Sequence, residues 1–211
     1  MMMRYILLAL LVPLTFVPLP AAAVEVVATS PSMGALVEAV AGPRAKLTVL
    51  AGQNRDLHML SAKPTMMRAL RGADLMVAIG ADLEVGWLPV AISGSANPGI
   101  LPGANGYFEA AAQVPLLDVG GPADRALGDV HPVGNPHVNM DPVRMATIAR
   151  ALAERLALID PAGAAAYRGG AEAFAAAVDA RVAQWGSTLR GAPGVVLYHR
   201  DALYLLDRFG V

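Results

Sequence analysis

Short β-branched runs alternate with helical patterns over the first half of the chain, and this alternation constrains the fold more than any other feature. Strands are expected at Val24–Thr29, Lys46–Leu50 and Asp74–Ile79, and helices at residues 33–41 and Pro64–Arg71. Strand, helix and strand in such close succession need right-handed crossovers, which give a parallel sheet. The sequence therefore predicts an α/β fold whose N-terminal lobe has a parallel four-stranded sheet with flanking helices.

The fourth strand and the loops carry weaker signals. Leu116–Val119 is the expected fourth strand, and residues 93–106, rich in Gly, Pro and Asn, are expected to form an irregular loop. Residues 120–139 contain Gly, Pro, Asp and two histidines without a sustained period. A loop beside a parallel sheet is a common place for binding residues, so this segment is a candidate for the functional site.

Helical patterns dominate the part of the chain that follows this loop. Asp141 is expected to cap a helix over residues 142–158, and an alanine-rich helix is expected over Ala162–Leu189. Pro161 interrupts the pattern, and Gly169-Gly170 predicts a further bend. Together these residues are expected to form a long linking helix region.

The last residues return to a strand and helix pattern. A strand is expected at Val195–Tyr198 and a helix at Asp201–Arg208. One strand and one helix cannot close a core, so they predict a second α/β lobe that continues beyond Val211. The expected organisation is a signal peptide at residues 1–23, an N-terminal metal-binding lobe at 24–141, the linking helix region at 142–190 and the beginning of a C-terminal lobe at 191–211.

The N-terminal residues have the organisation of a secretory signal peptide. Arg4 gives a positive start, an apolar stretch runs from Tyr5 to Leu19, and Ala21-Ala22-Ala23 has the small side chains of a cleavage site. A transmembrane anchor is the alternative, but prolines break the apolar stretch and it is shorter than the roughly 20 residues of a membrane span. The mature chain is therefore expected to begin near Val24.

The amino-acid composition limits the cellular compartments and the partners that can be expected. The sequence has no cysteine, which excludes disulfides, thiolate metal sites and a lipid-modified cysteine at the cleavage site. Export without a lipid anchor favours the periplasm. The formal net charge of −1 becomes −2 when the single positive charge of Arg4 is removed, and no basic run remains. Nucleic acid is therefore not an expected partner.

Four histidines are present, and each is expected in a loop or at the end of a strand. His58 follows the second strand, His131 and His137 lie in the loop before the long helices, and His199 ends the strand at 195–198. Imidazoles from separate strand ends can build the tetrahedral nitrogen site that Zn²⁺ takes. A lone histidine is more often an exposed or packed residue, so position alone leaves both interpretations open.

Three motifs around these histidines are more specific. The first is Asp56-Leu57-His58 with Pro64 at a fixed offset, followed by Ala73-Asp74-Leu75-Met76-Val77. The second is Asn135-Pro136-His137-Val138-Asn139-Met140-Asp141-Pro142, and the third is His199 with Tyr204 and Phe209-Gly210. In this order and spacing the motifs resemble those of the cluster A-I metal-binding proteins of ABC importers, the family of the zinc-uptake binding proteins.

The resemblance implies a function and a set of ligands. It implies a solute-binding protein, not an enzyme, that captures Zn²⁺ and delivers it to the membrane permease of an ABC importer. His58, His137 and His199 would bind the metal, with a carboxylate from the second lobe as the fourth ligand. Histidine in the third position favours zinc over Mn²⁺, because manganese-type members generally have a carboxylate there. A monomer is expected.

His131 is left over by these motifs. Zinc-uptake members often carry a mobile loop with histidines near this point, so His131 is either an accessory loop ligand or an ordinary exposed residue. Asp129 is a candidate hydrogen-bond partner for one of the imidazoles. Leu57, Met59 and Asn139 depart from the family pattern, and these departures concern packing around the site more than its ligands.

Two other functions stay open. A hydrolase or lyase could use a three-histidine zinc with a bound water, but no H-E-x-x-H or comparable motif supplies a general base. The other alternative is a manganese-binding member of the same family.

Overall fold

A four-stranded parallel sheet forms the centre of the fold. The computed structural model describes residues 23–120 and 131–211, and the predicted signal peptide lies almost entirely outside them. The strands are β1 (Val24–Ala28), β2 (Ala45–Val49), β3 (Leu75–Ala78) and β4 (Tyr107–Glu109), in the order β2-β1-β3-β4. Every neighbouring pair is parallel, which confirms the predicted sheet.

The fourth strand is not where the sequence pattern placed it. Tyr107–Glu109 pairs with β3, whereas the described segment Leu116–Val119 contains no strand, so that prediction was wrong. The predicted loop over residues 93–106 includes the end of a helix, α3 (Leu88–Ser95), and a short 3-10 helix, η2 (Pro98–Ile100). Strand β4 follows directly after this connection and takes the place of the fourth strand that was predicted at residues 116–119.

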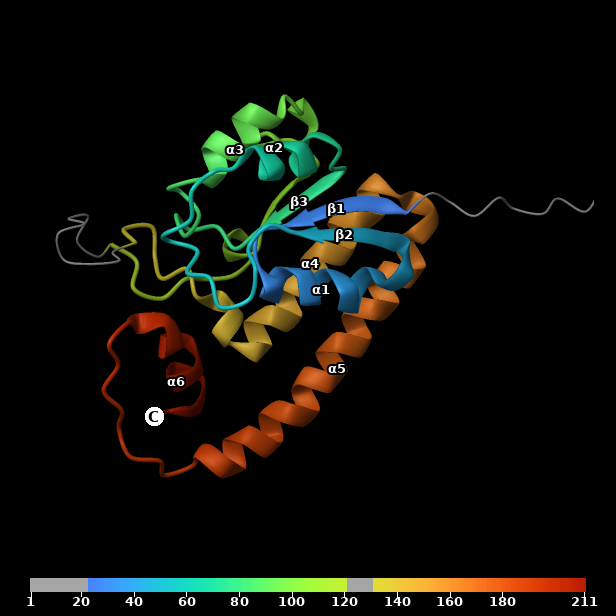
Figure 1. Cartoon of the computed structure of the whole chain (residues 1–211). Helices are drawn as coiled ribbons and strands as arrows, with labels where there is room; N and C mark the ends of the chain where they lie inside the picture. The colour runs from blue at the N-terminus through green and yellow to red at the C-terminus, as the bar shows by residue number, and fades with distance from the viewer. Residues whose placement is uncertain (1–22, 121–130) are drawn as a thin grey trace, which may run out of the picture.

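Helices cover both faces of the sheet (Figure 1). One face carries α1 (Pro31–Ala41) and α4 (Pro142–Ile159), and the other carries α2 (Pro64–Arg71) and α3. Successive side chains of β1 point to opposite faces of the sheet, since Val26 lies in the core beneath α1 and Val27 in the core beneath α2. Burial on both sides explains why the two central strands, β1 and β3, are largely apolar.

The helical second half consists of two packed helices. After α4 the chain reverses at η6 (Pro161–Gly163), and α5 (Ala164–Leu189) packs against α4 and α1 (Figure 1). Asp160 stabilises the reversal, because its carboxylate accepts hydrogen bonds from Tyr167 Oη at 2.6 Å and from Arg44 Nη2 at 2.7 Å. Helix α5 is continuous through Gly169-Gly170, so the interruption falls at residues 160–163 alone.

Gly170 has a packing role in α5. A Cβ atom built on it would lie 2.4 Å from the carbonyl oxygen of Val40 in α1, while one built on Gly169 would meet no atom within 4 Å. The backbones of α5 and α1 therefore approach each other too closely for any side chain at position 170.

The last described segment packs back against the region around Leu117 and Asn135–Asp141. The predicted strand at Val195–Tyr198 was wrong, since this described stretch has neither helix nor strand, and Val196 and Tyr198 are 101% and 108% exposed. A strand needs a neighbour for its backbone groups, and none of the strands that the structure describes pairs with this stretch. The predicted helix is present as η7 (Arg200–Ala202) and α6 (Leu203–Phe209).

Tyr204 anchors α6 to the loop before α4. Its side chain is fully buried, and its hydroxyl donates to the carbonyl of Asn135 at 2.7 Å and accepts from the backbone N–H of Leu117 at 3.0 Å. No helix in the described part of the chain is long and apolar enough to cross a membrane. The proposed division into lobes and a linking region stays a prediction.

Candidate metal centre

All four histidine side chains converge on one place. The Nε2 atoms of His58 and His131 are 3.1 Å apart, and those of His137 and His199 are 2.9 Å apart. The ring centroids of His58 and His199 are separated by 5.5 Å, so the two pairs adjoin. The residues come from the loop after β2, the loop before α4 and the turn before η7, which meet beside the carboxyl ends of the strands (Figure 1).

The donor atoms lie close enough to share one ion. Ring nitrogens of His58, His131 and His137 all lie within 4.8 Å of one another. His199 joins them through its contact with His137. The structure thus brings together the three predicted ligands and also His131, the residue that the sequence motifs left over.

Asp56 fixes the orientation of the His58 ring. One carboxylate oxygen, Oδ1, lies 2.8 Å from Nδ1 of His58 and accepts the backbone N–H of His58 at 2.9 Å. Burial alone would raise the pKa of Asp56, but the hydrogen bonds from His58 outweigh burial and hold the pKa below its usual value. A carboxylate on Nδ1 keeps the proton there, so the lone pair of Nε2 faces the other imidazoles.

Asn135 connects the segments that carry His137 and His199. Its Oδ1 accepts the backbone N–H of His137 at 2.9 Å, and its Nδ2 donates to the carbonyl of Arg200 at 2.9 Å. Arg200 is the neighbour of His199 in the sequence. One buried amide side chain therefore sets the spacing of two histidines that are far apart along the chain.

His137 is held as a neutral imidazole. Burial and the nearby rings of His199, His58 and His131 lower the pKa of His137 to about 4. Its ring nitrogen therefore keeps a lone pair at neutral pH, as a metal ligand requires.

Sequence reasoning missed two residues that position this site. Trp87 is fully buried and its indole Nε1 donates to the carbonyl of Leu57 at 2.9 Å, which fixes the backbone next to His58. Asn135 was noted only as part of the second motif. Its place two residues before His137 was the available signal, because Asn at that offset commonly hydrogen-bonds the backbone two residues on. Asp129 lies outside the described residues.

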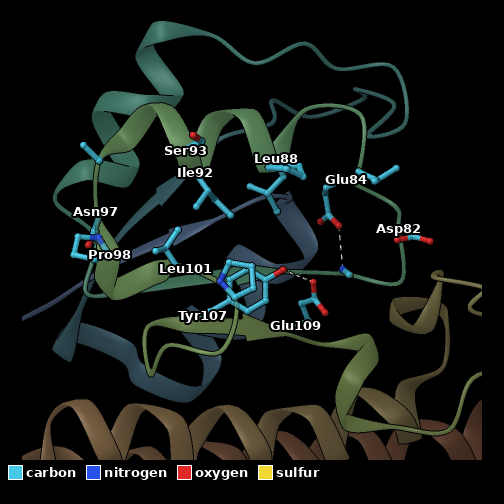
Figure 2. A pocket seen from close by; sticks show the side chains of 15 residues that line it. Asp82, Glu84, Leu88, Ile92, Ser93, Asn97, Pro98, Leu101, Tyr107 and Glu109 are labelled. Carbon is cyan, nitrogen blue, oxygen red and sulfur yellow. Dashed lines mark hydrogen bonds between the residues drawn. The ribbon is translucent and has the colours of Figure 1, made fainter.

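A separate cavity of about 530 Å³ lies between α3 and β4 (Figure 2). Glu84, Tyr107 and Glu109 line one end of it, and apolar side chains of α3 line the wall. Two of its carboxylates already have hydrogen-bond partners: Glu84 accepts from Thr29 Oγ1 at 2.7 Å and from two backbone N–H groups, and Glu109 accepts from the Tyr107 hydroxyl. None of the four histidines lines this cavity, so the histidine cluster is the candidate metal centre.

The sequence matches one protein-family model over residues 26–211, described as the periplasmic zinc-uptake complex component A. This match covers nearly all the residues that follow the predicted signal peptide. A direct sequence comparison with curated proteins gives no match.

Solved structures of metal-binding proteins share the fold. A zinc-bound deletion mutant of ZnuA superposes with a TM-score of 0.76 at 23% identity, over 90% of this chain and 68% of that one. The protein FpvC from P. aeruginosa in complex with Ni²⁺ gives 0.72 at 24% identity, over 90% and 64%. A zinc-bound variant of AdcAII from Streptococcus pneumoniae gives 0.72 at 22% identity, over 91% and 68%. At these identities the likeness establishes the fold.

Proposed function

The chain belongs to the family of the periplasmic zinc-uptake complex component A, and we propose that it captures Zn²⁺ outside the cytoplasm and delivers it to the permease of an ABC importer. Proteins of this family are non-enzymatic components of metal transport, which sets aside the hydrolase and lyase alternative. In this proposal His58, His137 and His199 bind the ion as cargo, and the predicted signal peptide exports the chain to the periplasm.

The observation that supports this proposal is the convergence of imidazole nitrogens from separate loops. The Nε2 atoms of His137 and His199 are 2.9 Å apart, and those of His58 and His131 are 3.1 Å apart, so the four rings surround one small region. Neutral nitrogen donors suit Zn²⁺, whereas Mn²⁺ prefers carboxylate and other oxygen ligands. The related structures include FpvC in complex with Ni²⁺ and with Mn²⁺, so the choice of metal needs its own measurement.

Chelator competition tests the ligands. We expect His58→Ala, His137→Ala and His199→Ala each to weaken Zn²⁺ binding at least tenfold, about 1.4 kcal/mol. Met59→Ala is the matched control, because Met59 is next to His58 but is 78% exposed, and it should bind like the original chain. Unchanged Zn²⁺ affinity in the triple histidine variant would contradict the proposed function.

Metal preference and delivery need two further measurements. Competition between Zn²⁺ and Mn²⁺ should favour Zn²⁺ by at least about tenfold if nitrogen donors dominate the site. Delivery is tested by zinc-limited growth of bacteria that lack their own zinc-binding component and express this chain with its permease. Growth that is lost in His137→Ala supports delivery, and equal growth of the original chain and His137→Ala contradicts it.

A further inference from the structure

We infer that His131 is a full fourth ligand of the metal, so that this chain supplies four imidazoles to one ion. The inference rests on the proposed function and changes the composition of its site. The sequence motifs predict three histidine ligands and leave His131 as either an accessory loop ligand or an ordinary exposed residue, whereas the structure places His131 in the same cluster as the other three.

The positions of the donor atoms support equal participation. Zn–N bonds of about 2.0–2.1 Å in a tetrahedral site put neighbouring nitrogens about 3.3 Å apart. The contact between His58 and His131, at 3.1 Å, is closer to this value than the contact between His137 and His199, at 2.9 Å. Ring nitrogens of His58, His131 and His137 lie within 4.8 Å of one another, so His131 belongs to the group of donors that one ion could share. His199 lies outside this group and adjoins it through its contact with His137.

The backbone next to His131 is anchored to a neighbouring segment. The carbonyl of His131 accepts the N–H of Gly134 at 2.9 Å, and the carbonyl of Pro132 accepts the N–H of Gly120 at 3.1 Å. A third bond, from the N–H of Asn135 to the carbonyl of Leu117 at 2.8 Å, closes the same pairing. His131 therefore projects from a held turn, and less entropy is lost when it binds an ion.

Gly134 allows this turn to pack closely against Leu116. It has a φ of +127°, and a Cβ atom on it would lie 2.7 Å from Cβ of Leu116. Only glycine allows the two segments to approach this closely. The position of His131 is thus built into the fold through contacts on its C-terminal side.

Hydrogen bonding between His58 and His131 uses the atoms that ligation would use. The two Nε2 atoms are 3.1 Å apart and face each other across the position that an ion would take. Metal binding would replace this contact. Four neutral nitrogens make the site more selective against Mn²⁺ than three nitrogens and a carboxylate would be.

Zinc affinity and Co²⁺ spectroscopy together test the inference. We expect His131→Ala to weaken Zn²⁺ binding at least tenfold, comparable with His137→Ala. We also expect the visible spectrum of the Co²⁺-loaded protein to change, and added imidazole to restore it by filling the vacated position. Val133→Ala, at a half-exposed position in the same loop, is the matched control and should leave affinity and spectrum unchanged.

The outcomes separate this inference from the proposed function. If His131→Ala keeps both the affinity and the Co²⁺ spectrum while His137→Ala loses zinc, His131 is not a ligand and the three-histidine site stands. If His58, His131, His137 and His199 can each be replaced without loss of zinc, the proposed function itself fails. Circular dichroism of the metal-free variants confirms that each comparison is between folded proteins.

Discussion

Asp141 and Arg208, which are 67 residues apart in the sequence, form an ion pair in which Nη2 of Arg208, on a partly exposed side chain, donates to Oδ2 of the buried Asp141 over 2.7 Å. Asp141 is fully buried, also pairs with Arg144, and caps α4 by accepting the backbone N–H of Val143 at 2.9 Å. The same carboxylate thus begins one helix and holds α6 in place, a few residues after His199.

Replacing Asp141 with Ala should destabilise the protein by about 2–4 kcal/mol, because the change removes a helix cap and leaves two arginines without their buried partner. Thermal or urea unfolding measures the loss. Glu172→Gln is the matched control: the Arg150–Glu172 pair is exposed, so its loss should change stability much less. Equal losses in the two variants would show that the pair of Asp141 and Arg208 does not hold α6.

Acid should remove the contribution of Asp141. Burial alone would raise its pKa, but hydrogen bonds from Arg208 and Arg144 outweigh burial and hold the pKa below its usual value. An unfolded Asp titrates near about 3.9, so between that value and the lower folded pKa the unfolded chain binds more protons. The stabilisation is therefore fully present above about 3.9 and is lost as the pH falls through the folded pKa.

Urea unfolding of the original chain and of Asp141→Asn, compared from about pH 6 down to about pH 3, measures this effect. The difference between the two proteins should be largest at the higher pH and should shrink with acid. Asp179→Asn, on the exposed side of α5, serves as the control. A difference that grows with acid would mean that the sign of the Asp141 contribution is wrong.

Asn135→Ala should weaken Zn²⁺ binding by roughly tenfold, because the link between His137 and the backbone beside His199 is lost. Chelator competition measures the affinity, and Asn105→Ala, an exposed asparagine far from the site in the sequence, is the control. Asn135→Asp should recover part of the loss, since its carboxylate can still accept the N–H of His137. Full affinity in Asn135→Ala would show that the amide only supports the fold.

Two neighbouring glycines of α5 should respond oppositely to alanine. Gly170→Ala brings a methyl group against the carbonyl of Val40 and should destabilise the protein by about 1–3 kcal/mol. Gly169→Ala meets open space and should stabilise it by about 0.5–1 kcal/mol through helix propensity. Melting temperatures of the two variants decide whether α5 and α1 are packed as closely as described.

The sheet could be predicted because its first three strands are β-branched runs separated by helical periods. Strand β4 could not, since Tyr107–Glu109 is too short to show a period, whereas Leu116–Val119 has a largely apolar composition but forms no strand. Val195–Tyr198 has a strand-like composition, but composition does not provide the neighbouring strand that would pair with it.

The motifs were sufficient to single out His58, His137 and His199 as candidates, because each histidine stands in a recognisable local pattern. His131 has no such pattern around it. Its place beside His58 depends on the pairing of residues 117–120 with residues 132–135, a contact between loops that local sequence does not encode. The roles of Asn135 and Trp87 also depend on tertiary hydrogen bonds to distant backbone.

The exposed segment that leads to His199 has a consequence for how the four imidazoles assemble. Between the end of α5 and η7 the described chain has no regular structure, while α6 is tied to the lobe by Tyr204 and Asp141. This tether makes the encounter of His199 with the other three rings intramolecular, so its effective concentration is set by the tether length and by the strength of the two ties. Loosening either tie therefore lowers the effective concentration of the His199 imidazole at the site without altering any ring. The dissociation rate of the ion should then rise.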